Sequence, residues 1–375
     1  MPFFSTKPQA LPVRSRIYRC LYELDSFCTK QELARRCNIS KPTLYQHLSA
    51  LMDEGLVRYS GEEKSTGGRK AQGVEIVPDA RFAVGISVAE NHLRFAAADL
   101  RLNKLAYMKL PFVPNVQAQL AVESIASALE IFLNENALDR ARLLGVGVAL
   151  PGIISSDGEW IEFSPTFHLK DMPIAGLSSA IPYRVHNAND ASSSGHAEWF
   201  LHGGRQNMAF LSLENGVGGA VLIGGAPYYG DHRRSGEFGH ICVEPGGLPC
   251  NCGKSGCLEA YCSARRISDD LGITLKEFFQ SVEHHDPERE TLWFDVLRHL
   301  AAGINSIHMA LDCDVVLGGF LSEYLQPYLP ILKRYVLAGN PFETNAEFVQ
   351  LSTLRKHTVP LGAALHFVRE FIENV

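Results

Sequence analysis

The chain has 375 residues, and its 46% hydrophobic and 20% charged content is ordinary for a globular protein. This length is sufficient for two or three domains, each with its own core. No apolar run is long enough to span a bilayer and no signal-peptide pattern opens the chain, so we expect a cytoplasmic protein with no membrane insertion. The nine cysteines form an odd set concentrated around one segment, which favours the same reducing compartment.

The charge is unevenly distributed along the chain, although the net charge is only −6. Residues 1–80 carry 12 Lys and Arg against 9 Asp and Glu, whereas the remainder carries 23 against 32. A basic front on an acidic body indicates that nucleic acid, if it is bound, is bound by the N-terminal segment.

Three helix patterns follow one another near the N-terminus. Apolar side chains recur at helical spacing from Val13 to Leu24, which predicts a first helix after a loose tail. The run Thr29-Lys30-Gln31-Glu32 is a capping box, and it predicts the start of a second helix. Ser40 can cap a third helix, which ends near Gly55. Two short helices around a tight turn, after a leading helix, are typical of a helix-turn-helix.

The N-terminal part of this third helix exposes side chains of the kind that reach base edges in the major groove of DNA. The candidate DNA contacts on it are Lys41, Thr43, Tyr45, Gln46 and His47. We therefore expect double-stranded operator DNA as a partner. Because helix-turn-helix proteins usually read paired half-sites, we also expect a homodimer or a higher homo-oligomer.

Two alternating strands, 56–59 and 74–77, enclose a glycine-rich basic loop that reads as a wing. Arg69 and Lys70 follow a pair of glycines in this loop, and such an arginine can enter a minor groove or hold phosphates. A winged helix can also bind another protein. The basic loop favours DNA over that alternative.

The rest of the chain reads as two α/β lobes, joined to the head at 78–81. The first lobe has predicted strands at 82–88, 93–99, 105–112 and 143–149, with a helix at 116–133. After about residue 185 the same logic repeats, with strands at 208–214, 219–223 and 313–317 and helices between 264 and 311. Mixed strands and helices in this order suggest α/β lobes, and a cleft between two lobes is the usual place for a small ligand.

One segment of the second lobe carries a histidine and three closely spaced cysteines. The candidate metal ligands are His240, Cys250, Cys252 and Cys257. One imidazole and three thiolates suit a tetrahedral, coordinatively closed zinc, which would shape a loop and not activate water. The alternative is a set of unrelated buried thiols, because a free cysteine packs as a small hydrophobe. Clustered cysteines in a reducing compartment favour the metal.

Two motifs in this segment resemble the ROK family (repressors, open reading frames and sugar kinases). They are E-x-G-H at 237–240 and C-x-C-G-x-x-G-C-x-E at 250–259, and the wing motif S-x-G-G-R at 65–69 resembles that of ROK repressors. The resemblance implies a winged helix-turn-helix followed by a two-lobed ribonuclease-H-like ROK domain of the actin and hexokinase type. The expected domains are the head 1–77, a first lobe 78–187 plus 358–375, and a second lobe 188–357 with the zinc loop.

The resemblance also implies a sugar site between the lobes. The residues that match the family's sugar contacts are Asn189, Asp190, Glu237, His240 and Glu259. Carboxylates beside an amide and an imidazole suit a polyol, whose hydroxyls both donate and accept hydrogen bonds. By itself an Asn-Asp pair usually marks a turn or a cap. A neutral, an amino and a phosphorylated sugar all stay open as the effector.

The first phosphate loop departs from the family pattern G-x-D-x-G-G-T-K. The aligned residues run from Gly85 to His92, with Ser87 in place of the metal-facing Asp and Ala89-Glu90 in place of the glycine pair. A glutamate beside three phosphates is repulsive, and the magnesium that accompanies ATP loses a ligand. We therefore expect no kinase activity.

Taken as a resemblance to ROK repressors, these features predict a regulator, most simply a repressor, of carbohydrate-metabolism genes with a structural zinc. Two alternatives stay open: a sugar kinase with an added DNA-binding head, and a regulator that acts mainly through protein contacts. The sequence leaves open whether the ligand releases or promotes DNA binding.

Overall fold

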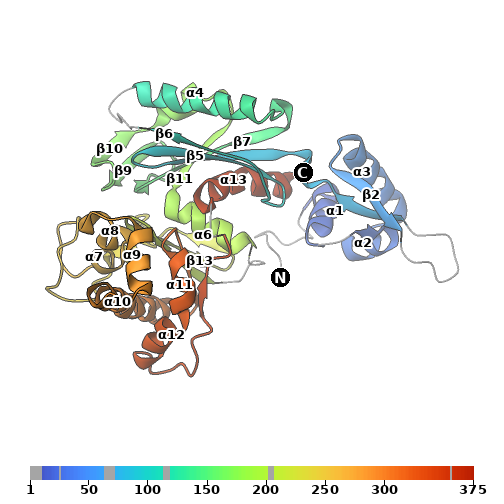
Figure 1. Cartoon of the computed structure of the whole chain (residues 1–375). Helices are drawn as coiled ribbons and strands as arrows, with labels where there is room; N and C mark the ends of the chain where they lie inside the picture. Colours follow the sequence, from blue (N-terminus) through green and yellow to red (C-terminus); the bar gives the residue numbers. More distant parts are fainter. Residues whose placement is uncertain (1–10, 25–26, 63–71, 113–118, 202–206, 355–356) are drawn as a thin grey trace.

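The computed structural model describes residues 11–24, 27–62, 72–112, 119–201, 207–354 and 357–375 (Figure 1). It consists of a small N-terminal head beside a body with two stacked α/β layers. None of the helices in these ranges is both long and apolar enough to cross a bilayer.

The head is a three-helix unit with a three-stranded sheet in the order β1-β3-β2. Its elements are α1 (Val13–Tyr22), β1 (Cys28–Thr29), α2 (Lys30–Cys37), α3 (Lys41–Asp53), β2 (Val57–Glu62) and β3 (Gln72–Ile76). The side chains of Thr29 and Ser40 accept hydrogen bonds from the backbone N–H of Glu32 and Thr43, so the two predicted N-caps are present. The carboxylate of Glu32 does not complete the capping box, because it pairs with Arg35 and Arg36.

The first body sheet has the order β6-β5-β4-β7-β11, with β4 to β6 antiparallel and β4, β7 and β11 parallel. Its elements are β4 (Phe82–Val88), β5 (His92–Asp99), β6 (Lys104–Pro111), α4 (Gln119–Glu135), β7 (Leu143–Leu150) and β11 (Val185–Asn189). A small sheet and a short helix precede β11: β8 (Ile153–Ile154), β9 (Trp160–Ser164), β10 (Leu169–Pro173) and α5 (Ala175–Ala180). Helix α4 covers the outer face, where Phe132 stacks on Phe95.

The second body sheet repeats this topology in the order β14-β13-β12-β15-β16. Strands β12 to β14 are antiparallel, and β12, β15 and β16 are parallel. Its strands are β12 (Met208–Leu213), β13 (Val217–Ile223), β14 (Ala226–Tyr228), β15 (Asp314–Gly318) and β16 (Val349–Leu351). The helices that follow β11 in the chain are α6 (Asp190–Leu201), α7 (Leu258–Cys262), α8 (Ala264–Ile267), α9 (Leu275–Glu283), α10 (Pro287–Leu311), α11 (Ser322–Leu325), α12 (Leu329–Ala338) and α13 (Thr358–Asn374).

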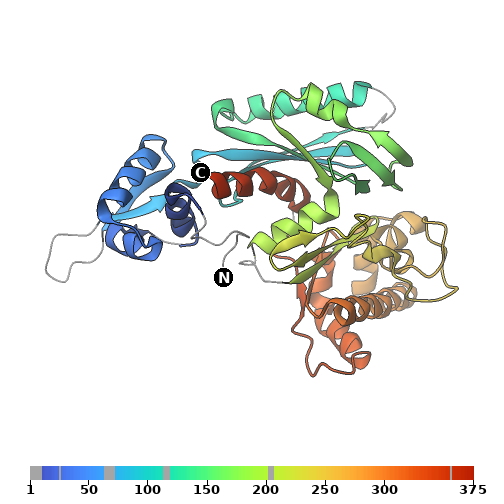
Figure 2. The same ribbon diagram turned by 180° about the vertical axis from the view of Figure 1, so that it is seen from behind.

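Helices α6 and α13 lie between the two sheets, as both views show (Figures 1 and 2). Helix α13 packs on β4 and β7 of the first sheet. Helix α6 packs on β12 and β13 and crosses α13 where a Cβ at Gly362 would overlap the Ser193 carbonyl. The missing side chain at Gly362 therefore allows the two helices their close approach.

A strand and a helix meet at the Asn189-Asp190 pair. The strand β11 runs from Val185 to Asn189, and Asp190 is the first residue of α6. The sequence did not indicate α6, because this helix is buried on several sides and so lacks an amphipathic pattern. The Asn189-Asp190 pair therefore lies at a junction of strand and helix and not in an open turn.

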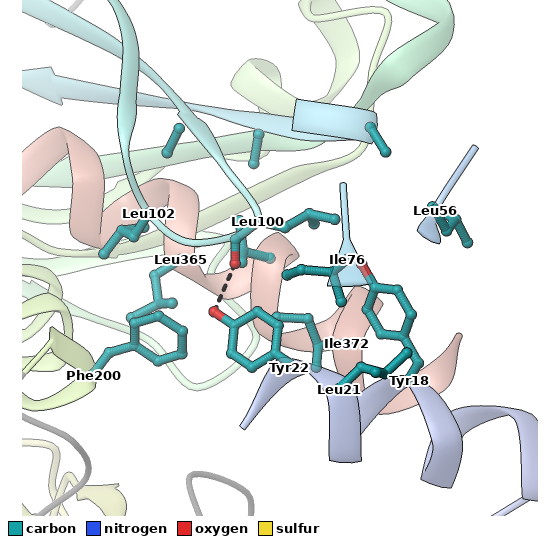
Figure 3. Packing of buried hydrophobic residues seen from close by; sticks show 14 of the residues in the cluster. Tyr18, Leu21, Tyr22, Leu56, Ile76, Leu100, Leu102, Phe200, Leu365 and Ile372 are labelled. Atoms are coloured by element: carbon teal, nitrogen blue, oxygen red, sulfur yellow. Dashed lines mark hydrogen bonds between the residues drawn. The ribbon is translucent and has the colours of Figure 1, made fainter. Parts of the chain in front are cut away.

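The head shares one hydrophobic core with the body (Figure 3). On α1, the Tyr22 ring lies 6.3 Å from Phe200 of α6, and the Tyr18 ring lies 6.1 Å from Phe371 of α13. The Tyr22 hydroxyl donates a 2.7 Å hydrogen bond to the Leu100 carbonyl. Because these contacts bury aromatic side chains of both parts, the head is packed on the body and not merely tethered to it.

Candidate metal site, ligand site and nucleic-acid interface

The four predicted metal ligands meet at one point of the second lobe. One ligand atom from each of His240, Cys250, Cys252 and Cys257 lies within 4.8 Å of the other three. The Sγ atoms of Cys252 and Cys257 are 3.7 Å apart, and Cys250 Sγ is 3.8 Å from His240 Nδ1. Zn–S bonds of about 2.3 Å in a tetrahedron place two sulfurs about 3.8 Å apart. This group could therefore hold a metal ion, and its spacing fits zinc.

The loop that carries the cysteines is closed by its own backbone. Cys250 N–H donates to the Lys254 carbonyl, and Val243 N–H donates to the Gly256 carbonyl, both at 2.8 Å. Gly256 has φ +83°, and a Cβ there would overlap the Glu244 carbonyl, so only glycine fits this turn. Cys257 then caps α7, whose Leu258 is fully buried in the second core. The metal ligands are thus attached to a rigid helix at one end.

His240 lies between the thiols and the carboxylate of Glu237. Its Nδ1 is on the thiol side, whereas its Nε2 is 3.9 Å from Glu237 Oε2. A metal on Nδ1 would leave Nε2 with the proton, as a donor that faces Glu237. Burial raises the pKa of Glu237. His240 lowers this pKa, and the charge of Glu259 raises it.

Glu259 connects the metal loop to the turn between β12 and β13. Its Oε2 accepts a 2.9 Å hydrogen bond from Val217 N–H, and its Oε1 is 3.9 Å from Cys250 Sγ. Both oxygens already have neighbours within the protein. A role for Glu259 in ligand binding therefore stays a prediction. Its side chain does connect the metal loop with the turn between β12 and β13.

Asp190 lies in a field of other carboxylates. Burial raises the pKa of Asp190 to about 7, and the charges of Glu214 and Glu237 act in the same direction. Its Oδ1 accepts a 2.8 Å hydrogen bond from Ala191 N–H and a 3.2 Å one from Asn189 Nδ2. An aspartate whose pKa lies near neutrality can accept a hydrogen bond from a hydroxyl when it is ionised, or donate one to the hydroxyl when it is protonated.

Glu214 is a charged residue of this site that the sequence interpretation missed. It directly follows β12, and burial raises its pKa while Arg94 of β5 lowers it. It lies directly before the glycine-rich turn that joins β12 to β13. A signal was present in the sequence, because a charged residue directly before a glycine-rich loop is a natural position for a ligand contact.

The titration of Asp190 predicts a pH-dependent cost. Because its pKa is raised from 3.8 to about 7, the folded protein keeps a proton that the unfolded chain loses between these pH values. The contribution of Asp190 to the free energy of unfolding therefore falls as pH rises from about 4 to about 7, and it stays constant above that pH. We expect Asp190→Asn to gain free energy of unfolding relative to wild type at pH 8 but not at pH 4. Denaturant unfolding across this range measures the difference, and a pH-independent difference would contradict the raised pKa.

The altered phosphate-loop residues lie at the hairpin between β4 and β5. Ser87 is 3% exposed within β4, and Glu90 is exposed at the turn. Ala89 N–H donates a 3.0 Å hydrogen bond to the His92 carbonyl, which closes the turn on itself. This N–H is already bonded within the chain, so a phosphate oxygen would have to compete for it.

The structure presents the predicted base-contacting residues at the N-terminal part of α3. Lys41, Tyr45 and Gln46 are exposed there, and Thr43 and His47 are half-buried. The opposite face of α3 buries Leu44, Leu48 and Leu51 in the head. Arg69 and Lys70 lie outside the described residues.

A cavity of about 720 Å³ lies where the head meets α13, and none of the five predicted sugar contacts lines it. Its lining residues come from α1, α3, β7 and α13 and from the ends of these elements. It is therefore part of the junction between head and body and is distinct from the metal loop.

Both parts of the chain match known protein families. Residues 12–58 match the winged helix-turn-helix DNA-binding family, and residues 83–369 match the ROK family. A solved ROK family transcriptional regulator, described as a homologue of the E. coli MLC protein, has the same fold with a TM-score of 0.77 at 19% identity, over 96% of both chains. The predicted fold class, a winged helix-turn-helix before an actin- and hexokinase-like α/β body, is confirmed.

The chain belongs to the ROK family. It is 22% identical to the xylose repressor of Bacillus subtilis over 332 residues, which are 87% of this chain and 83% of that protein. It is 26% identical to the glucokinase of Halalkalibacterium halodurans over 280 residues, 68% of this chain and 85% of the kinase. Repressors and kinases thus both occur among its relatives, and the similarity to the repressor covers more of this chain.

Proposed function

We propose that the protein is a DNA-binding transcriptional repressor of carbohydrate-metabolism genes, controlled by a sugar or sugar derivative. The observation that supports it most strongly is the winged helix-turn-helix at 12–58 in a ROK chain, because it comes with similarity to a repressor along 87% of the sequence. The regulated state is proposed to be a homodimer or higher homo-oligomer on paired half-sites.

The sugar is proposed to bind between a first lobe (78–187 plus 358–375) and a second lobe (188–357), with residues 1–77 as the head. Support for this division comes from α13, which packs on the first sheet, and from α6, which packs on the second. The proposed contacts are Asn189, Asp190, Glu237, His240 and Glu259, with Glu214 added because its charge acts on Asp190.

The metal is proposed to be a structural zinc held by His240, Cys250, Cys252 and Cys257. A bound zinc would contribute folding free energy and hold the loop between η4 (Phe238–His240) and α7. The chain's own residues then position the ligand: the loop fixes His240 and places Glu237 beside its outer nitrogen.

We propose that the protein does not phosphorylate its ligand. Support comes from Ser87, which is buried where the pattern requires a metal-facing aspartate, and from Glu90 at the turn. Glu214 adds a second carboxylate on the side of the glycine turn. Two carboxylates near the expected phosphate positions would repel ATP.

The test has two steps with the full-length protein. DNA selected from a random library should yield a preferred operator, and Gln46→Ala should change the preferred bases, whereas the exposed Gln280→Ala on α9 should not. Neutral, amino and phosphorylated sugars are then titrated into the operator complex, with ATP consumption measured in parallel. Absence of sequence-specific binding would refute the regulator, and sugar-dependent ATP turnover would establish the kinase instead.

A further inference from the structure

A lysine and two tyrosines from three different elements of the head form one exposed cluster. Lys30 is the first residue of α2, Tyr45 lies on α3 and Tyr59 lies on the wing strand β2. Lys30 Nζ donates a 2.8 Å hydrogen bond to the Tyr59 hydroxyl and lies 4.5 Å and 5.1 Å from the ring centroids of Tyr59 and Tyr45. Tyr45 and Tyr59 are 50% and 44% exposed, although aromatic rings are usually buried.

The charge of Lys30 distinguishes it from several arginines of the head. Arg35 and Arg36 both pair with Glu32, Arg14 pairs with Glu54, and Arg58 pairs with Glu75. Within the part of the chain that the structure describes, no carboxylate pairs with Lys30. Its ammonium has three N–H donors, of which the Tyr59 oxygen takes one.

The two tyrosines hold this cation in place instead of neutralising it. A cation over aromatic rings is attracted by the ring quadrupoles, and this attraction leaves the positive charge available. The Tyr59 hydroxyl accepts from Lys30, so its own O–H is a donor that a further acceptor can use. N–H and O–H donors that converge beside an unpaired cation fit an anionic oxygen.

We propose that Lys30 and Tyr59 bind a DNA backbone phosphate and thereby fix the recognition helix relative to the wing. The inference rests on the proposed DNA-binding function and adds two contact residues to it. Phosphate contacts position a protein on the duplex without reading sequence. Tyr45, which packs against the same ammonium, would then be oriented by the phosphate contact before it reaches a base edge.

The salt dependence of operator affinity tests this proposal. Each neutralised phosphate contributes about 0.9 to the slope of log K against log salt. We expect Lys30→Gln to reduce the slope by about 0.9, which removes about 3.5-fold of the affinity change between 50 and 200 mM salt. The loss should be equal for specific and unrelated DNA. Lys30→Arg should keep the wild-type slope. Tyr59→Phe should weaken operator binding and leave the slope unchanged, because it removes a hydrogen bond but no charge.

The control is Lys276→Gln, which removes the same charge from the exposed face of α9 in the second lobe. A wild-type slope in Lys30→Gln, or an equal reduction of the slope in Lys276→Gln, would refute the phosphate contact. Neither result would contradict the proposed DNA-binding regulator. A melting temperature lowered in Lys30→Gln without a change of slope would show a purely structural cluster. A wild-type protein that binds no DNA would remove both this contact and the proposed function.

Discussion

Cys257→Ser should release the zinc and lower the melting temperature by several degrees. Cys257 Sγ is one of the four converging ligand atoms, and a serine hydroxyl does not replace a thiolate on zinc. A ligand present at about 100 times its dissociation constant stabilises the folded state by about 2.7 kcal/mol, and this contribution is lost with the site. Metal analysis should find close to one zinc per chain in wild type and almost none in the variant.

Cys242→Ser is the matched control for this experiment. Cys242 is exposed and lies outside the four-ligand group, although its backbone pairs with that of Cys257. It should therefore keep both the zinc and the melting temperature. A chelator should lower the melting temperature of wild type and leave Cys257→Ser unchanged. Wild-type protein purified without zinc, at full stability, would contradict the proposed metal site.

Asp190→Asn should abolish the response to sugar and leave operator binding intact. Asp190 begins α6, and Phe200 near the other end of this helix lies against Tyr22 of the head. Helix α13 crosses α6 and contacts the head through Phe371. A ligand that changes the angle between the lobes would therefore move the surface on which the head is packed.

The size of the effect follows from linkage. A sugar can change operator affinity only by its differential affinity for two states, commonly 5–150-fold, or about 1–3 kcal/mol, and operator must change sugar affinity by the same factor. In Asp190→Asn, sugar should not change operator affinity, because the substitution alters the ligand contact and leaves α6 and the head folded as in wild type. The control is the exposed Asp269→Asn, which should respond as wild type does. An unchanged response in Asp190→Asn would exclude this residue from the ligand site.

The sequence indicated the features that depend on neighbouring residues. The metal ligands Cys250, Cys252 and Cys257 lie within eight positions of one another, so short glycine turns bring them together in almost any context. The caps Thr29 and Ser40 act on backbone groups three residues away, and the strands of the first sheet alternate or run apolar over their own length. Local geometry determines such features.

The bounds of β11 and the existence of α6 were not predictable in this way. Helix α6 packs against neighbours on several sides, so its side chains carry no contrast between an exposed and a buried face. Strand β11 is an edge strand in which only Asn187 is buried, so it has neither an apolar run nor an apolar alternation. The charged neighbours of Asp190 had no local pattern either. Glu214 is 24 positions away in sequence and acts on Asp190 only because β12 and α6 pack together.

The winged helix-turn-helix head, the ROK body and the His-Cys group for a metal could all be predicted from the sequence, because motifs and periodicity encode them over short distances. The packing of the head on the body, in contrast, follows from the complete fold. Tyr18 and Tyr22 of the head are far in sequence from their ring partners Phe371 and Phe200, and nothing local distinguishes these side chains from other apolar ones. Their contact arises because burying aromatic surface is favourable and non-directional, so the partner of each ring depends on the whole fold.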